Sequence, residues 1–464
     1  MKATAPEDKV PLKEKLAYGA GGMNDSLMGN AFHNIANPIL NMTLGVSTSV
    51  IGVAMFIPNL WNAFSDPIIG HASDQTKSRF GRRKPFLLIG AIIASLALIG
   101  LWGFLPTEAS ENTYFWMLLI GAIVFFTGTT LFLVPWNALG FEMTADYNER
   151  TRLMSVRSLM AVSAGFTLPW IAAILFWDGF RSPLSAVLWL SIGLSVIFII
   201  CALIPSLFCK ERLKETADKQ KTVSLVKGVG QTIGNRPFLL VTATVLVLIT
   251  SFFMVDILGQ YLIFYYMYNG NLETGAVLHG INGTANSIIA LGAIPIATWL
   301  ATRFGKRRII MIFMVMASVG ALLRWFFYVP GQSYVILVST FLIAPGFSAL
   351  WLLVPSLLAD VCDFEELRTG RRAEATIGAV YGWVTKLGFS VAFFIGNVSL
   401  DLIGFNVDLS GEQSEQTFFL MRALFVAIPT IGFALGGFLM YKYELSPRRM
   451  EEIKTELEAR RSKA

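Results

Sequence analysis

Long apolar segments separated by short polar loops follow one another along most of the chain. An α-helix needs roughly 20 predominantly apolar residues to cross the hydrocarbon core of a bilayer, and the pattern predicts twelve such helices. The longest polar stretch between them, residues 210–236, leaves six on each side. The predicted spans lie near residues 16–44, 48–72, 86–105, 113–142, 154–177, 184–208, 237–268, 276–301, 309–329, 333–359, 375–404 and 417–441.

The distribution of charged residues predicts the orientation of these helices in the membrane. Only 15% of the 464 residues are charged, against roughly a quarter in soluble domains. Lys and Arg gather in every second loop and in both terminal segments, and loops of this kind lie on the cytoplasmic side of a membrane. We therefore expect a multi-pass protein of the cytoplasmic (inner) membrane with both termini in the cytoplasm. Because the formal charge of +6 is spread over these loops, nucleic-acid binding is not expected.

Two short motifs recur at equivalent places in the two halves. RFGRRKP at 79–85 returns as RFGKRR at 303–308, and VPWNAL at 134–139 is echoed by VPSLLAD at 354–360. Duplicated halves are typical of secondary transporters, which bind their substrate between the halves. The sequence thus predicts an all-α membrane protein with twelve transmembrane helices in two pseudo-repeated six-helix halves. The expected parts are a first bundle (1–209), a cytoplasmic middle loop (210–236), a second bundle (237–441) and a cytoplasmic tail helix (442–464).

Several ionisable side chains fall inside the predicted spans. Asp66 follows Asn62 and Ser65 in the second span, at spacings that place Asn62 and Asp66 on one helix face. Lys386 and Asp256 lie in the eleventh and seventh spans. A charged group at such depth is costly and usually faces a bundle interior or a water-filled cavity. These residues therefore indicate a path for an ion or a polar solute.

Six segments resemble the glycoside–pentoside–hexuronide:cation symporter family of the major facilitator superfamily. The resemblance implies a twelve-helix fold, alternating access, and cotransport of a sugar or glycoside with H⁺, Na⁺ or Li⁺. The segments are LAYGAGG at 16–22, LWNAFSDPIIGHASDQTKSRFGRRKP at 60–85, VPWNALGFEMTADYNERTRLMSVR at 134–157, NRPFLL at 235–240, ADVCDFEELRTGRRAEA at 359–375 and YELSPRRMEEI at 443–453.

The resemblance implies a cation-coupling site in the second and fourth spans. The family pattern has two acids in the second span. Here the second acid is kept as Asp66, Asn62 and Ser65 replace the first acid and an asparagine, and Thr130 matches a threonine of that site. Two carboxylates would compensate the desolvation of Na⁺ better than one, so the pattern favours H⁺, with Na⁺ as the alternative. Apart from the co-transported ion, neither a cofactor nor a metal site is expected.

Substrate contacts are expected in both halves. Asp25 falls near a sugar-binding acid of the family, and Lys386, in VTKLG, would link sugar occupancy to the cation site. A second such acid corresponds to Leu133 here, which argues against a galactoside specificity. Polar and aromatic side chains near these positions could supply hydrogen bonds and stacking surfaces, although helix–helix hydrogen bonding explains any single Asn equally well. The expected substrate-binding residues are Asp25, Asn30, Asn34, Trp136, Asn137, Tyr381, Trp383, Lys386 and Asp256, the last of which could instead pair with Lys386 or move protons.

Charged loops on the cytoplasmic side are expected to control the conformational change. In the superfamily the loop after the second span latches the helices, so its charges would bias one state of the transporter against the other. Similar charges follow the tenth span. The expected gating residues are Asp74, Arg79, Gly81, Arg82 and Arg83 in the first half, and Asp363, Glu366, Arg371 and Glu374 in the second.

Other functions compete with the symporter hypothesis. A Na⁺-coupled lysolipid carrier is a second possibility, but that branch of the family keeps both acids of the second span. A membrane sensor would leave Asp66 and Lys386 without a purpose. An enzyme or an ATP-driven pump is not expected, because the sequence contains neither a nucleophile–base arrangement nor a phosphate-binding GxxxxGK[ST] loop. We expect a monomer that acts on a small sugar or glycoside within the lipid bilayer.

Overall fold

The structure, a computed structural model, describes residues 9–76, 78–144, 146–210, 234–370 and 374–461. The regular structure of these residues is helical. The chain forms two compact units. The first comprises residues 1–220, 271–281 and 406–409, and the second comprises residues 221–270, 282–405 and 410–464.

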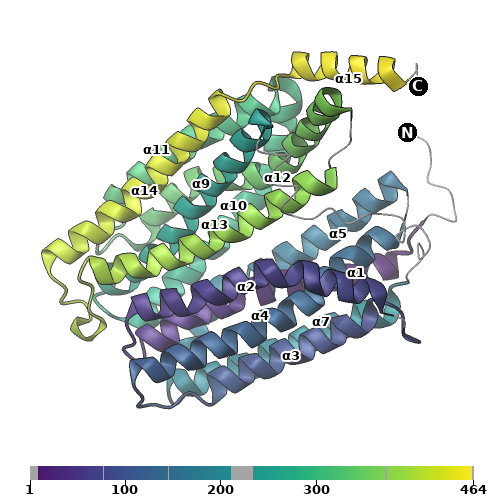
Figure 1. Cartoon of the computed structure of the whole chain (residues 1–464). Coiled ribbons are helices and arrows are strands. Elements are labelled where there is room, and N and C mark those ends of the chain that lie inside the picture. Colours follow the sequence, from purple (N-terminus) through teal and green to yellow (C-terminus); the bar gives the residue numbers. More distant parts are fainter. Residues whose placement is uncertain (1–8, 77, 145, 211–233, 371–373, 462–464) are drawn as a thin grey trace. The chain divides into compact units, whose positions relative to one another are not determined.

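In the first unit, long helices pack along one another (Figure 1). Helix α1 packs against α5 and α7, α2 packs against α4, and α3 lies between α4 and α7. The elements are α1 (Leu12–Ala36), η2 (Asn37–Asn41), α2 (Thr48–Gln75), α3 (Lys84–Gly103), α4 (Glu111–Glu142), α5 (Tyr147–Gly165), η3 (Leu168–Trp170), α6 (Ile171–Leu175) and α7 (Pro183–Phe208).

Small residues allow α3 and α4 to approach one another closely. A Cβ atom added to Gly90 would lie 2.5 Å from the backbone nitrogen of Phe132, and one added to Gly128 would lie 2.5 Å from that of Ala94. Membrane helices commonly associate through such small residues, because lipid provides no hydrophobic driving force between them. This tight contact holds α4, which carries Thr130 and Trp136, in place.

In the second unit, α9 packs against α13 and α14, and α11 packs against α12 and α14. The last helix, drawn in yellow in Figure 1, packs against α12 through a buried face formed by Met450, Ile453 and Leu457. The elements after residue 235 are α9 (Arg236–Tyr261), η5 (Leu262–Met267), α10 (Leu272–Phe304), α11 (Lys306–Phe327), η6 (Ser333–Val335), α12 (Ile336–Thr369), α13 (Glu374–Leu402), η7 (Val407–Leu409), α14 (Glu415–Tyr441) and α15 (Pro447–Arg461). Of these, η7 and the part of α10 up to residue 281 belong to the first unit.

Local signals in the sequence explain where several helices begin. Ser110, Asp146, Ser182 and Asn235 each accept a hydrogen bond at the N-terminus of the helix that follows. Such side-chain caps satisfy backbone N–H groups that have no partner within the helix. Most of the predicted middle loop, residues 211–233, lies outside the described residues.

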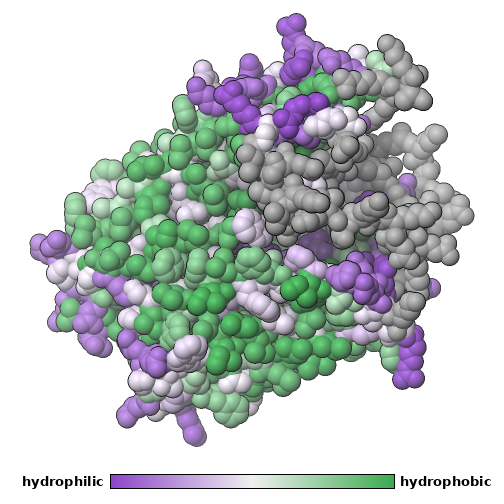
Figure 2. All heavy atoms as spheres, in the orientation of Figure 1, coloured by the Kyte–Doolittle hydropathy of each residue, from purple (hydrophilic) through white to green (hydrophobic). Residues whose placement is uncertain are grey.

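Ten helical segments of the described chain are long and apolar enough to cross a membrane. The outer faces of these helices carry exposed hydrophobic side chains. Figure 2 shows hydrophilic side chains gathered toward the helix ends. Helices α1 and α2 have 25 and 28 residues, so they are also long enough, but their polar residues lower their hydropathy. The presence of twelve spans and the cytoplasmic location of the termini stay predictions.

Candidate functional site

A polar trio formed by Asn62, Ser65 and Thr130 joins α2 to α4. The hydroxyl of Thr130 donates to Oδ1 of Asn62 over 2.8 Å, and the hydroxyl of Ser65 lies 3.3 Å from that of Thr130. Ser65 and Thr130 are buried. The structure therefore brings together three of the four residues expected at the cation-coupling site.

Asp66, the fourth expected residue, follows Ser65 on α2 and is half-buried. It lies one helical turn after Asn62, on the same face. The next residue, Pro67, lies inside the helix and has no N–H, so the carbonyl of Ala63 lacks its usual helical donor. The neighbourhood thus offers one carboxylate together with amide, hydroxyl and carbonyl oxygens.

A second polar centre in the first unit connects α1, α4 and α5. The guanidinium group of Arg157 donates to Asp25 over 3.0 Å and stacks 4.5 Å above the ring of Trp136. The Asp25 and Arg157 side chains are 34% and 26% exposed, so a solute can reach them. Trp136 is itself buried; its Nε1 donates to the carbonyl of Tyr18, and its ring stacks on the Tyr18 ring. In this arrangement Trp136 supports Arg157 from behind.

The predicted asparagine contacts differ from one another. Asn30 and Asn34 donate to the backbone carbonyls of Ser26 and Asn30, one turn earlier on α1. These bonds run along α1 itself and not to a neighbouring helix. Asn137, on α4 beside Trp136, is half-buried.

The remaining expected substrate residues belong to the second unit. Tyr381, Trp383 and Lys386 are half-buried on α13, where the backbone carbonyl of Tyr381 accepts the hydroxyl of Thr385. Asp256 is exposed on α9, and its carboxylate is close enough to act electrostatically on Arg324 of α11 and on Tyr328, the residue that follows this helix. Whether these residues contact a substrate stays a prediction.

The loop after α2 forms a charged latch at one end of the first unit. Here we call Asp74, Arg82, Arg83 and Glu142 the latch. Arg83 contacts Glu142 over 2.7 Å and Asp74 over 2.9 Å, and Arg82 also binds Glu142. Arg83 and Glu142 are buried, so this is more than a surface ion pair.

Two further residues of the expected gate lie in the same loop but outside these contacts. Gly81 has a φ of +108°, a left-handed conformation that favours glycine, and it allows the loop to turn. Arg79 stacks over the neighbouring Phe80 ring. Neither residue belongs to the ion pairs described around Glu142.

The second unit carries a different set of ion pairs at the matching position. Lys306 contacts Asp360 over 2.7 Å, and Arg368 contacts Glu365 over 2.9 Å. Near the Lys306–Asp360 pair, burial raises the pKa of the Tyr443 phenol well above its ordinary value, and the charge of Asp360 raises it further. Tyr443 therefore stays neutral, and Asp360 balances Lys306.

The gating residues predicted in this half lie close by in the sequence. Asp363 and Glu366 are half-buried on α12. Arg371 lies outside the described residues, and so does the side chain of Glu374. The acids that the structure places in ion pairs here, Asp360 and Glu365, were not among the predicted gating residues.

Sequence reasoning missed Arg157 of the second polar centre and Glu142 of the latch. Arg157 pairs with Asp25 across 132 positions of the chain, and Glu142 pairs with Arg83 across 59. Both residues stand within the VPWNAL…SVR segment. An acid at the end of one span and a cation inside the next were the available signals, but they do not identify a partner.

Comparison with known proteins gives a match over nearly the whole chain. The family described as MFS/sugar transport protein matches residues 17–447. The chain is 26% identical to the uncharacterized symporter YjmB of Bacillus subtilis, over 97% of this chain and 96% of that protein. It is 23% identical to the isoprimeverose transporter of Lactiplantibacillus pentosus, over 96% and 92%. It is 25% identical to the mouse sodium-dependent lysophosphatidylcholine symporter 1, over 99% and 90%.

A solved structure shares the fold. The chain is similar to a bacterial homolog of the human lysosomal transporter Spinster, with a TM-score of 0.65 and 13% identity, over 94% of this chain and 98% of that one. At this identity the likeness concerns the fold alone.

Proposed function

Because this chain belongs to the MFS/sugar transport protein family, whose members are membrane transporters and not enzymes, we propose that it is a symporter of a sugar or glycoside. Relatives that align along almost the entire chain are symporters, and one of them carries isoprimeverose. We further propose that the coupling ion is H⁺ and that the protein lies in the cytoplasmic membrane. Transport would follow alternating access between the two halves.

The observation that carries the proton assignment is the polar trio beside Asp66. Asn62, which stands where the family pattern has an acid, accepts the Thr130 hydroxyl over 2.8 Å. An ion bound here would thus meet a neutral amide oxygen at position 62 that already accepts a hydrogen bond from Thr130. Asp66 would supply one carboxylate. Replacing the water around Na⁺ needs several oxygen ligands and compensating negative charge. Moving a proton needs only one carboxyl group that ionises in one state and is neutral in the other.

The substrate end of the proposal rests on the Asp25–Arg157 pair. A carboxylate and a planar guanidinium group can exchange part of their mutual contact for sugar hydroxyls, since both side chains are partly exposed and sugars need placed donors and acceptors. Lys386 and Asp256 of the second unit would complete the substrate contacts. Binding of the sugar would then be linked to protonation of Asp66 through Lys386.

A Na⁺-coupled carrier is the competing function, because one relative is a sodium-dependent lysophosphatidylcholine symporter. The same site separates the two possibilities. A Na⁺ carrier would gain from a second carboxylate at position 62, whereas a proton carrier would not need it.

The test is uptake of a panel of sugars and uronides into proteoliposomes with an inward pH gradient and no Na⁺. We expect accumulation of at least one sugar, and its loss in Asp66→Asn, while exchange of that sugar without a gradient continues. Asp178→Asn, the same change at an exposed loop position, should behave like the wild type. Asn62→Asp should introduce stimulation by Na⁺. Uptake by the wild type that requires Na⁺ and ignores the pH gradient would contradict the proton assignment.

A further inference from the structure

The repeated basic motif has different surroundings in the two units. In the first unit, both Arg82 and Arg83 are bound to Glu142. In the second unit, Lys306 is bound to Asp360, and Arg307 donates to the backbone carbonyls of Met440 and Tyr441 at the end of α14. Arg307 stands at the position of Arg83 in the repeated motif. Arg83 binds the carboxylate of Glu142, whereas Arg307 binds backbone carbonyls at the end of α14.

Two arginines of the second motif take part in none of these ion pairs and hydrogen bonds. Arg303 and Arg308 are exposed, and neither has an ion pair or hydrogen bond within the described part of the chain. Arg303 only stacks at 5.7 Å and 5.6 Å from the rings of Trp299 and Phe304. The second unit thus presents two exposed guanidinium groups beside its internally bound Lys306 and Arg307.

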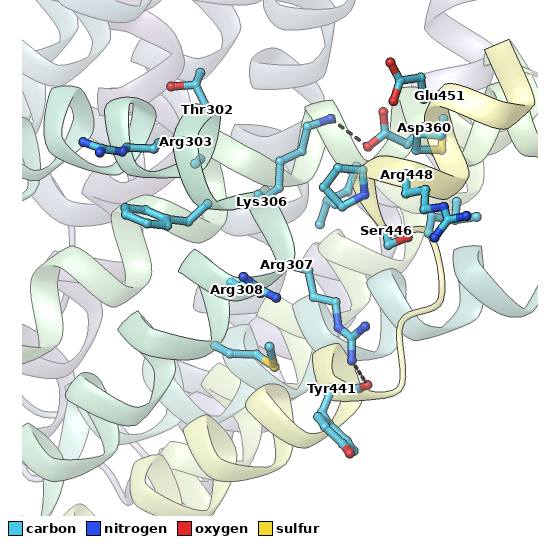
Figure 3. A pocket seen from close by; sticks show the side chains of 18 residues that line it. Thr302, Arg303, Lys306, Arg307, Arg308, Asp360, Tyr441, Ser446, Arg448 and Glu451 are labelled. Carbon is cyan, nitrogen blue, oxygen red and sulfur yellow. Dashed lines mark hydrogen bonds and ion pairs between the residues drawn. The ribbon is translucent and has the colours of Figure 1, made fainter. Parts of the chain in front are cut away.

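These arginines line an open groove with a volume of about 1080 Å³. In Figure 3, Arg303 comes from the end of α10, Arg308 from the start of α11, and Arg448 from the start of α15. We call this the basic groove. Its lining includes five cationic side chains but only two carboxylates, and one of these, Asp360, already binds Lys306. The basic groove therefore carries an excess of positive charge that invites an anion.

The groove is held by packing on both sides. A Cβ atom added to Gly305 would lie 3.1 Å from Pro447, so the turn between α10 and α11 touches the start of α15. Helix α15 is anchored by its buried face, including Met450 and Ile453. The apolar part of the groove wall includes Met311, Leu357, Leu445 and Met450.

Exposed aromatic side chains lie in the groove wall and beside Arg303. Trp299, Phe304 and Tyr441 are 58%, 47% and 61% exposed. Aromatic residues of this kind mark the headgroup level of a bilayer, and basic residues beside a membrane helix attract anionic lipids. A soluble anion would have no use for this aromatic rim or for apolar walls next to the charges.

We propose that the basic groove binds the phosphate headgroup of an anionic phospholipid, with Arg303 and Arg308 as its main contacts. The acyl chains would run along the apolar flank of α10 beside Trp299. This inference goes beyond sugar transport and would stand if the substrate or the coupling ion were different. Bound lipid would join the turn after α10 to α15.

The test titrates phosphatidylglycerol into the detergent-solubilised full-length protein and follows thermal stability and the adducts seen by native mass spectrometry. We expect phosphatidylglycerol, but not phosphatidylcholine, to bind and to raise the melting temperature, less strongly at high salt. The double variant Arg303→Gln/Arg308→Gln should bind phosphatidylglycerol about ten- to thirty-fold more weakly. Lys13→Gln/Arg181→Gln removes two exposed charges elsewhere and should leave binding unchanged.

Two results would overturn the proposal. One is phosphatidylglycerol binding by the Gln double variant that equals that of the wild type. The other is inorganic phosphate that displaces the lipid at equal concentration, because this would make the groove a site for a soluble anion. Arg303→Lys/Arg308→Lys retains the charge and should keep most of the binding, so a folding defect in the Gln variant would not hide the answer.

Discussion

Arg157 has two contacts that fix its guanidinium group. It donates to Asp25 over 3.0 Å, and the Trp136 ring lies 4.5 Å below it. A planar cation stacked on an aromatic face is well defined in orientation, so the position of Asp25 is defined as well. The buried hydrogen bond from Trp136 to the Tyr18 carbonyl holds the ring in place. The partly exposed Asp25–Arg157 pair is therefore positioned by the buried ring of Trp136.

Removing the arginine should weaken substrate binding. Arg157→Gln loses a charge-assisted hydrogen bond, which contributes roughly 1.5–3 kcal/mol, and we expect about ten- to a hundred-fold weaker binding of the transported sugar. Arg157→Lys keeps the charge but not the planar fork, so it should fall in between. Isothermal titration or substrate-protected thermal shift measures the effect, with Arg181→Gln as the control. Unchanged affinity in Arg157→Gln would remove this pair from the substrate site.

At the scale of the helices, the close contact of α3 with α4 positions the cation-coupling site. Gly90 and Gly128 face one another's backbones across this contact. Thr130 lies two residues after Gly128 on α4 and bonds to Asn62 of α2. A change in the spacing of α3 and α4 would therefore reach the polar trio.

Substitution at this contact should reduce stability. In Gly128→Ala the new methyl group would lie 2.5 Å from Ala94 N and 2.8 Å from Gly90 O, and such overpacking costs about 1–3 kcal/mol. We expect a lower melting temperature and reduced proton-driven uptake. The matched control is Gly100→Ala on α3, where nothing lies within 4 Å of the added atom; it should be neutral or slightly stabilising. Equal melting temperatures for the two variants would show that the contact can relax.

At the scale of the whole molecule, the latch is an obvious candidate for control of the transport cycle. Its central groups, Arg83 and Glu142, are buried, whereas Asp74 is 52% exposed at its side chain. Interactions that form in one state only shift the balance between states by their full free energy. All four residues of the latch belong to the first unit, and we predict that they control the transport cycle.

Glu142→Gln should release the latch. Arg83 would lose its contact with the buried Glu142 carboxylate and keep the one with the exposed Asp74, and removing one member of a buried pair costs about 3–5 kcal/mol. We expect faster hydrogen–deuterium exchange in residues 74–86 and at the end of α4, together with an altered ratio of uptake to efflux. Glu108→Gln, an exposed substitution, provides the control. An unchanged exchange pattern would mean that the latch contributes little to this end of the unit.

The sequence by itself determined the properties that depend on local composition. Apolar length predicts helices, and the ten long apolar segments of the described chain agree with it. The motifs led to the family, which the match over residues 17–447 confirms. They also singled out the α2–α4 residues, because one short motif contains Asn62, Ser65 and Asp66.

Only the tertiary structure decided which distant side chains meet. It pairs Asp25 with Arg157 and Glu142 with Arg82 and Arg83, and it turns Trp136 from a candidate stacking surface into a buried support. Hydropathy is a sum over neighbours along the chain, whereas a pair of charges 132 positions apart depends on how helices pack and rotate against one another. The same reason explains the two basic motifs. Nearly identical in sequence, one binds Glu142, and the other lines an open groove because α14 ends and α15 begins beside it.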